Sequence, residues 1–89
     1  MRIPIRTNRF KKDLERMIKR GKNGGKARYV LSSLIEERPL ESVFHDHPLS
    51  GDWTDRRECH IEPDWLLIYK IEKDRIIFER TGTHSDLFG

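Results

Sequence analysis

The spacing of the apolar residues changes once along this chain, at Pro39, and that change limits the folds open to it. Before Pro39, apolar residues recur every three or four positions, which is typical of amphipathic helices. The two apolar stripes are Phe10, Leu14, Met17 and Ile18, and then Ala27, Val30, Leu31, Leu34 and Ile35. After Pro39, short segments at 57–62, 65–72 and 75–83 alternate or form apolar runs, as strands do. Helices followed by strands predict an α+β fold.

The ends of the two expected helices follow from local signals. Thr7 or Asn8 can cap the first helix, and Gly21 suits its C-terminal end. The second helix ends at Arg38, because the residue before a proline avoids the helical backbone conformation. A short loop at 22–25 joins the two helices, so we expect an antiparallel helical hairpin with one apolar face to bury.

Two further segments complete the expected fold. Residues 1–6 predict a short strand, which Pro4 confines to a sheet edge or to the start of a strand. Residues 40–55 have little periodicity and predict a loop that contains at most a short strand. We expect a single domain for all 89 residues, in which the basic helical hairpin of 1–38 packs on a small, mostly antiparallel sheet formed by 39–89.

The composition excludes several classes of protein. The longest apolar run is the five residues Trp65–Tyr69, whereas a membrane span needs about 20. The first ten residues contain no apolar segment of the kind that secretory signals carry. The single cysteine, Cys59, excludes an internal disulfide and is typical of a reducing cytosol. We therefore expect a cytoplasmic protein without a membrane segment.

Charge is divided unequally between the two halves of the chain. Residues 1–38 contain 12 Lys and Arg against 4 Asp and Glu, whereas residues 39–89 contain 6 against 11 and hold all 4 histidines. Most basic residues of the first half fall outside the apolar stripes, so we expect them to face solvent or a partner. Either they coat solvated helices or they form a face that binds a polyanion.

Three histidines lie near other groups that can carry chemistry. His47, His60 and His84 each fall at a strand end or in a loop, where a sheet can hold functional side chains rigidly. With Asp64 and Arg80 they supply the groups that general acid–base cleavage of a phosphodiester needs. A base removes the proton of the attacking hydroxyl, an acid protonates the leaving oxygen, and a cation neutralises charge on the phosphorane.

Each of these residues also has a purely structural interpretation. A histidine on a strand is most often a surface residue or a hydrogen-bonded one. Arg80 can pair with Glu58 or Glu79 at the surface. Asp64 can simply form the turn that follows Pro63.

A metal site is a further alternative. His45 and His47, together with Cys59 or His60, offer metal-ligating atoms at short spacing. Because no second strong ligand pair follows them, we expect no metal and no other cofactor.

Three segments of the second half carry a resemblance to a known family. Residues 45–53 read HDHPLSGDW, residues 57–69 read RECHIEPDWLLIY, and residues 80–88 read RTGTHSDLF. In this order and spacing they closely resemble the YafQ family, type II toxins of the RelE/ParE superfamily, whereas residues 1–38 match in pattern only. The resemblance implies a RelE-like microbial RNase fold. It also implies a ribosome-dependent endoribonuclease that cuts mRNA in the decoding site and stops translation.

The resemblance also implies which side chains form the active site. The family's active-site positions fall here on His47, His60, Asp64, Trp65, Arg80, His84 and Phe88. From its position near the C-terminus, Phe88 is predicted to dock the tail on the protein by hydrophobic contact. Trp65 is predicted only to pack within the sheet. In the family both lie at the catalytic pocket, where an aromatic face can stack on an unpaired base.

Roles for the five polar residues follow from RNA chemistry. The 2′-hydroxyl is a nucleophile already tethered beside the phosphate, so no metal is needed in principle. We assign Asp64, with His60 or His47, to the side of the general base. Arg80 compensates charge on the phosphate, and His84 is the general acid for the 5′-oxygen.

Partners follow from the resemblance as well. It implies a cognate antitoxin protein, the 70S ribosome with its RNA and bound message, and operator DNA only through the antitoxin complex. We expect Lys11, Lys12 and Lys19 to contact ribosomal RNA. Two other classes stay open: a ParE-like toxin that poisons gyrase, which lacks this histidine set, and a non-catalytic nucleic-acid-binding module.

Overall fold

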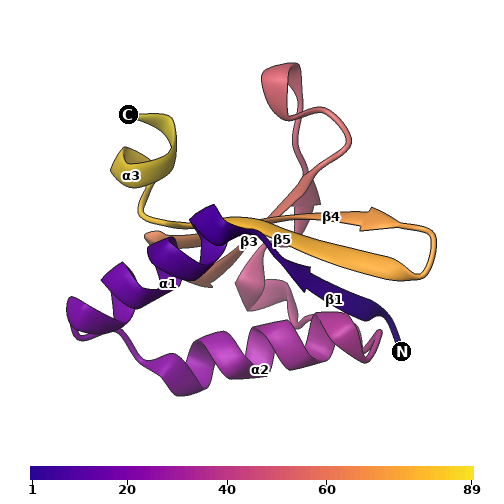
Figure 1. Ribbon diagram of the computed structural model, residues 1–89, viewed down its shortest axis with the longest axis horizontal. Helices are drawn as coiled ribbons and strands as arrows, with labels where there is room; N and C mark the ends of the chain where they lie inside the picture. The colour runs from indigo at the N-terminus through magenta and orange to yellow at the C-terminus, as the bar shows by residue number, and fades with distance from the viewer.

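The computed structural model describes all residues from 1 to 89 as helices packed on a sheet of five strands (Figure 1). The main elements are β1 (Ile3–Arg6), α1 (Asn8–Lys19), α2 (Gly24–Ile35), β3 (Arg57–Glu62), β4 (Trp65–Glu72), β5 (Arg75–Gly82) and α3 (His84–Phe88). The loop between α2 and β3 contains the 3₁₀ turns η1 (Ser42–Phe44) and η2 (Gly51–Trp53) and the short strand β2 (His47–Pro48). The expected α+β class is confirmed.

The sheet has the strand order β1-β5-β4-β3-β2, and only the pair β1–β5 is parallel. Helices α1 and α2 lie on one side of it, whereas α3 and the loop that contains η2 stand on the other side (Figure 1). The sheet therefore separates a face covered by the helical hairpin from an open face. The sequence did not predict α3 or the two 3₁₀ turns.

The helices begin where polar side chains can satisfy free backbone N–H groups. The Thr7 side chain accepts a hydrogen bond from the Phe10 N–H at 3.0 Å, so Thr7 rather than Asn8 caps α1. The Asn23 side chain accepts from the Gly25 N–H at 2.9 Å at the start of α2. No helix of the structure has the length and apolar composition that crossing a membrane requires.

The core lies between the helical hairpin and the sheet. Phe10 and Met17 of α1 and Val30 and Leu34 of α2 are buried there, as their apolar stripes predict. The Phe10 ring packs against the ring of Phe78 in β5, with 5.6 Å between centroids. These contacts fix α1 beside β5, the strand that leads directly into α3.

Replacing Phe78 with Ala should lower the free energy of unfolding by about 3–5 kcal/mol, because the cavity left behind cannot fill. Urea unfolding followed by circular dichroism measures this loss. Val43→Ala is the control, since the Val43 side chain is 69% exposed and should change stability by less than about 0.5 kcal/mol. Equal losses for the two variants would contradict this description of the core.

Candidate active site

All four histidines lie together at one end of the sheet. His47 in β2 pairs with Glu58 in β3, and His60 lies two residues further along β3 on the same face. His84 is the first residue of α3, directly after β5 and Thr83. The His60 ring centroid lies 6.2 Å from that of His47, 6.0 Å from that of His84 and 5.6 Å from that of His45. We call these four residues the histidine cluster.

Glu58 is a member of this site that its sequence position did not reveal. Its side chain is only 8% exposed, and Oε2 lies 3.0 Å from His47 Nε2 and 3.7 Å from His60 Nε2. The alternation of β3 puts Glu58 and His60 on the same face, and that was the signal that could have found it. A buried carboxylate beside two imidazoles can orient their rings or exchange a proton with them.

Asp64 holds His84 in place. Its Oδ1 lies 2.7 Å from His84 Nδ1 and accepts a hydrogen bond from the His84 N–H at 3.0 Å. These hydrogen bonds, first the backbone one and then the side-chain one, lower the pKa of the Asp64 carboxyl. Both side chains are more than half exposed, so His84 Nε2 stays accessible while Nδ1 is engaged.

Arg80, in β5, lies in the same cross-strand row as His47 and Glu58, and its side chain is only 12% exposed. The register connects His47 to Glu58, Glu58 to Ile68, and Ile68 to Arg80. Its guanidinium is bound by Asp13 of α1, with Nε to Oδ2 at 2.6 Å and Nη2 to Oδ1 at 3.2 Å. The alternative that Arg80 pairs with Glu58 or Glu79 is therefore wrong.

The two aromatic residues implied by the resemblance are placed differently. Trp65 is fully buried, and its indole Nε1 donates a hydrogen bond to Thr81 Oγ1 at 2.9 Å. Phe88 is 47% exposed, and its ring lies 6.3 Å from that of Trp53 at the end of η2. Beside η2 and α3, a nucleic-acid base can therefore reach Phe88 and the neighbouring Trp53, but not the buried Trp65.

The short helix α3 is held on two sides. Asp86 closes a capping box with Thr83 and also accepts two hydrogen bonds from Arg20 of α1, at 2.7 and 3.1 Å. The Arg20 guanidinium and the Thr83 N–H hold the pKa of Asp86 well below its usual range. A Cβ at Gly82 would lie 2.9 Å from the Cβ of Asp86, so this close approach requires glycine. A helix this short depends on such tertiary contacts.

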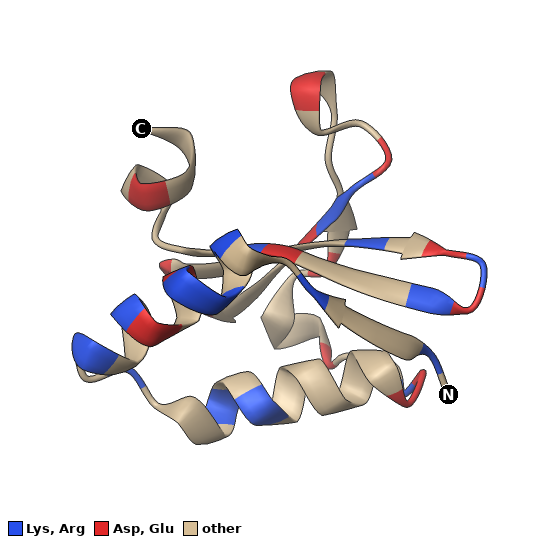
Figure 2. Cartoon of the chain, in the orientation of Figure 1, with Lys and Arg blue, Asp and Glu red and all other residues tan.

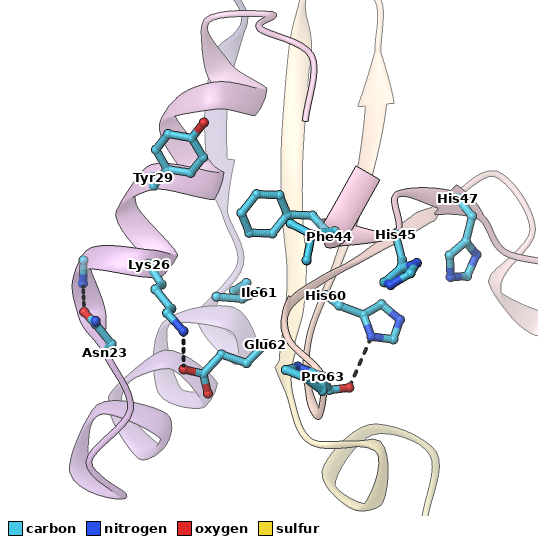
Figure 3. Close-up of a pocket in the computed structure, with 12 residues that line it drawn as sticks. Asn23, Lys26, Tyr29, Phe44, His45, His47, His60, Ile61, Glu62 and Pro63 are labelled. Atoms are coloured by element: carbon cyan, nitrogen blue, oxygen red, sulfur yellow. Dashed lines mark hydrogen bonds and ion pairs between the residues drawn. The ribbon is translucent and has the colours of Figure 1, made fainter. Parts of the chain in front are cut away.

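A groove of about 990 Å³ opens between α2 and the histidine cluster (Figure 3). His45, His47 and His60 line one end of it. Tyr29 and Phe44, whose ring centroids are 6.0 Å apart, line the other end. The groove gives a second approach to the histidines, from the edge of the sheet rather than from its open face.

One set of side chains in this site can hold a metal ion. His47, Glu58 and His60 each offer one ligand atom, and the three atoms lie within 4.8 Å of one another. Imidazole and carboxylate ligands of this kind suit zinc or copper. Cys59 does not belong to the set, because it points into the core, where burial raises the pKa of its thiol.

The basic residues of the helical hairpin lie along α1 and α2 (Figure 2), and ion pairs within the protein engage several of them. Six of the basic residues of 1–38 form ion pairs within the protein: Arg2, Arg16, Arg20, Lys22, Lys26 and Arg38. Lys11, Lys12 and Lys19 are exposed on α1 and form no ion pair. With Arg9, which is also exposed and unpaired, these three lysines are the basic residues of α1 that remain open to a polyanion.

Comparisons with known proteins agree with one family. The family described as a bacterial toxin of type II toxin–antitoxin systems, YafQ, matches residues 2–89. The chain is 45% identical over 84 residues to the mRNA interferase toxin YafQ of Escherichia coli K12, which covers 93% of this chain and 91% of that one. It is 35% identical to a putative toxin YafQ of Haemophilus influenzae, over 89% of this chain and 84% of that one.

Solved structures match over the whole fold. The E. coli DinJ–YafQ complex contains a chain with a TM-score of 0.93 and 43% identity, with 100% of both chains covered. A metal-bound toxin from Helicobacter pylori matches with a TM-score of 0.92 and 38% identity, over 99% of this chain and 100% of that one.

The pKa of Asp64 should report whether α3 is in place. Asp86→Ala should raise it, because a released α3 takes away both hydrogen bonds from His84. His84→Ala should raise it less, because the backbone hydrogen bond remains. A carbon-13 NMR titration of the carboxyl groups measures both shifts.

Asp74→Asn, which removes an exposed carboxylate from the β4–β5 turn, is the matched control and should leave the pKa of Asp64 unchanged. The pKa of Asp64 in the folded protein lies below the unfolded value of about 3.9, so the contact between Asp64 and His84 stabilises the fold at pH values above about 3.9. This stabilisation is lost as the pH falls through the folded pKa. An Asp64 pKa that Asp86→Ala does not move would contradict the placement of α3.

Proposed function

Since the chain belongs to the YafQ family of type II toxin–antitoxin toxins and is an mRNA interferase, an endoribonuclease, we propose that it cuts messages in the decoding site of the ribosome. One observation carries the proposed chemistry: Asp64 orients His84, whose ring centroid lies 6.0 Å from that of His60, and Glu58 Oε2 lies 3.7 Å from His60 Nε2. Proton-accepting and proton-donating groups thus lie close to one another. Family membership decides against the gyrase-poisoning and non-catalytic alternatives.

The base side of the reaction belongs to His60 and Glu58. His60 Nδ1 faces the Pro63 carbonyl at 3.2 Å, so that nitrogen carries a proton and Nε2 is the one that can accept. Nε2 points toward Glu58, which can stabilise the imidazolium that forms. The sequence interpretation put Asp64 on this side with His60 or His47. The geometry favours Glu58 there, because Asp64 is engaged with His84.

The acid side belongs to His84. With Nδ1 held by Asp64, its accessible Nε2 can donate a proton to the 5′-oxygen as the bond to phosphorus breaks. Arg80 uses Nε and Nη2 for Asp13, so Nη1 is left to neutralise charge on the phosphate. Phe88, together with Trp53, offers the face on which a base next to the cleaved bond can stack.

The reaction proposed here is independent of metal. The attacking 2′-hydroxyl is part of the substrate, and the site supplies a base, an acid and a cation without further groups. A metal ion held by His47, Glu58 and His60 would occupy the proposed base. Removal of divalent metal is therefore a direct test of this part of the mechanism.

Partners complete the proposal. A cognate antitoxin binds the toxin and keeps it silent, as DinJ forms a complex with YafQ in E. coli. Operator DNA is reached only through that complex. On the ribosome, the exposed Lys11, Lys12 and Lys19 contact ribosomal RNA while the open face of the sheet meets the message.

Cleavage of a translated message on programmed ribosomes should leave a 2′,3′-cyclic phosphate or 3′-phosphate and a 5′-hydroxyl. It should persist after brief chelation by EDTA at a magnesium level that keeps the ribosomes intact. His84→Ala should lower the rate by at least about 100-fold, because general acid catalysis contributes about 10²–10⁴. A 3′-hydroxyl product, or cleavage that stops when transition metals are removed, would refute the mechanism.

Reversing the charge of Lys11, Lys12 and Lys19 to Glu should weaken ribosome binding and flatten its salt dependence. Each lost phosphate contact should reduce the slope of log affinity against log salt by about 0.7–0.9. The codon preference of the remaining cleavage should not change, since phosphate contacts carry no sequence information. The same reversals at Lys70, Lys73 and Arg75, in the β4–β5 hairpin, are the control. Unchanged affinity at physiological salt would show that the three lysines are only solvated surface.

A further inference from the structure

Asp13 is a buried carboxylate for which the proposed mechanism gives no role. It lies in α1 between the core residues Phe10 and Met17, and it is only 3% exposed. Burial of an unpaired carboxylate is strongly unfavourable, so a charge in this position needs several partners. A residue that merely filled a place in the apolar stripe of α1 would be apolar.

The partners of Asp13 come mainly from the end of β5. Oδ2 accepts hydrogen bonds from Arg80 Nε at 2.6 Å and from the Thr81 N–H at 3.2 Å. Oδ1 accepts from Arg80 Nη2 at 3.2 Å and from Arg16 at 2.8 Å. Asp13 thus holds the guanidinium of Arg80 by two parallel bonds, the geometry that fixes an arginine most firmly.

This pair determines what Arg80 can still do. An arginine side chain has several rotatable bonds, and holding it in one geometry has an entropic cost. Because Asp13 already holds the Arg80 side chain in the folded protein, binding of a phosphate does not have to bear this entropic cost. It also raises the pKa of Arg80, and Nη1 is the one guanidinium nitrogen without a partner in the protein.

We propose that Asp13 is a positioning residue of the active site, which fixes Arg80 so that Nη1 faces the phosphate that is cleaved. Asp13 does not touch RNA and acts only through Arg80. The proposal rests on the proposed role of Arg80 in cleavage. It gives α1 a part in the chemistry in addition to its part in docking.

The first test is Asp13→Asn, which keeps the shape of the side chain and removes its charge. At saturating ribosome concentration the cleavage rate should fall about 10- to 100-fold, as expected for a misplaced catalytic group. Ribosome affinity should stay within a factor of about two, because α1 keeps its lysines. Glu15→Gln is the matched control, since Glu15 is an exposed acid on the same helix and should leave the rate unchanged.

The second test separates positioning from a general structural role. In an Arg80→Ala background, Asp13→Asn should cause no further loss of cleavage rate, because Asp13 then has no catalytic group to place. A residue that only stabilised the fold would lower the rate by the same factor in both backgrounds. That result, or a wild-type rate for Asp13→Asn alone, would overturn the proposal.

The third measurement does not depend on cleavage or on a variant that folds. The Nε–H of Arg80 should give a resolved, slowly exchanging proton NMR signal in the wild type and in Glu15→Gln. A rapidly exchanging signal in the wild type would overturn the positioning role even if Asp13→Asn does not fold. If the Arg80 Nε–H signal exchanges slowly but the wild type does not cut messages, the proposed function is refuted. The hydrogen-bonded pair of Asp13 and Arg80 is then still confirmed.

Discussion

The arrangement of the candidate active site depends on the fact that β1 is shorter than the strand it pairs with. β1 covers β5 only as far as Phe78, so the last part of β5 has no strand on that side. α1 takes its place: Thr7 bonds the backbone of Phe78 and Glu79, and Asp13 accepts from the Thr81 N–H. The helix that satisfies this open edge therefore also reaches Arg80, which makes it part of the frame of the site.

The fold was predictable from the sequence wherever a pattern is local. Phe10 and Met17 face the core as their helical spacing requires, and the alternation of β3 sends Cys59 inward and His60 outward. Ile18, the last residue of the same predicted stripe, is 45% exposed, so that part of the prediction was wrong. The helix α3 was not predictable, because five residues do not show a helical period. It is stabilised by a capping box and by contacts with Arg20, which lies 66 positions earlier in the sequence.

The candidate site shows the same limit. The three strand-end histidines could be found by residue type and position, and the structure brings them together. Asp13 could not, because its link to Arg80 spans 67 residues and no pattern within α1 indicates it. Glu58 looked like a surface acid, because the sequence did not show that the short β2 would cover its strand and leave the carboxylate buried between two imidazoles.

We propose that the message is cut on the open face of the sheet, between His60 and His84. The most direct measurement is the structure of the toxin on a programmed ribosome whose message carries a 2′-O-methyl group at the cleavage site, which blocks the nucleophile. We expect the scissile phosphate between these two rings, with one of its oxygens bonded to Arg80 Nη1. A message that instead follows the groove beside α2, with His84 and Arg80 out of reach of any phosphate, would contradict it.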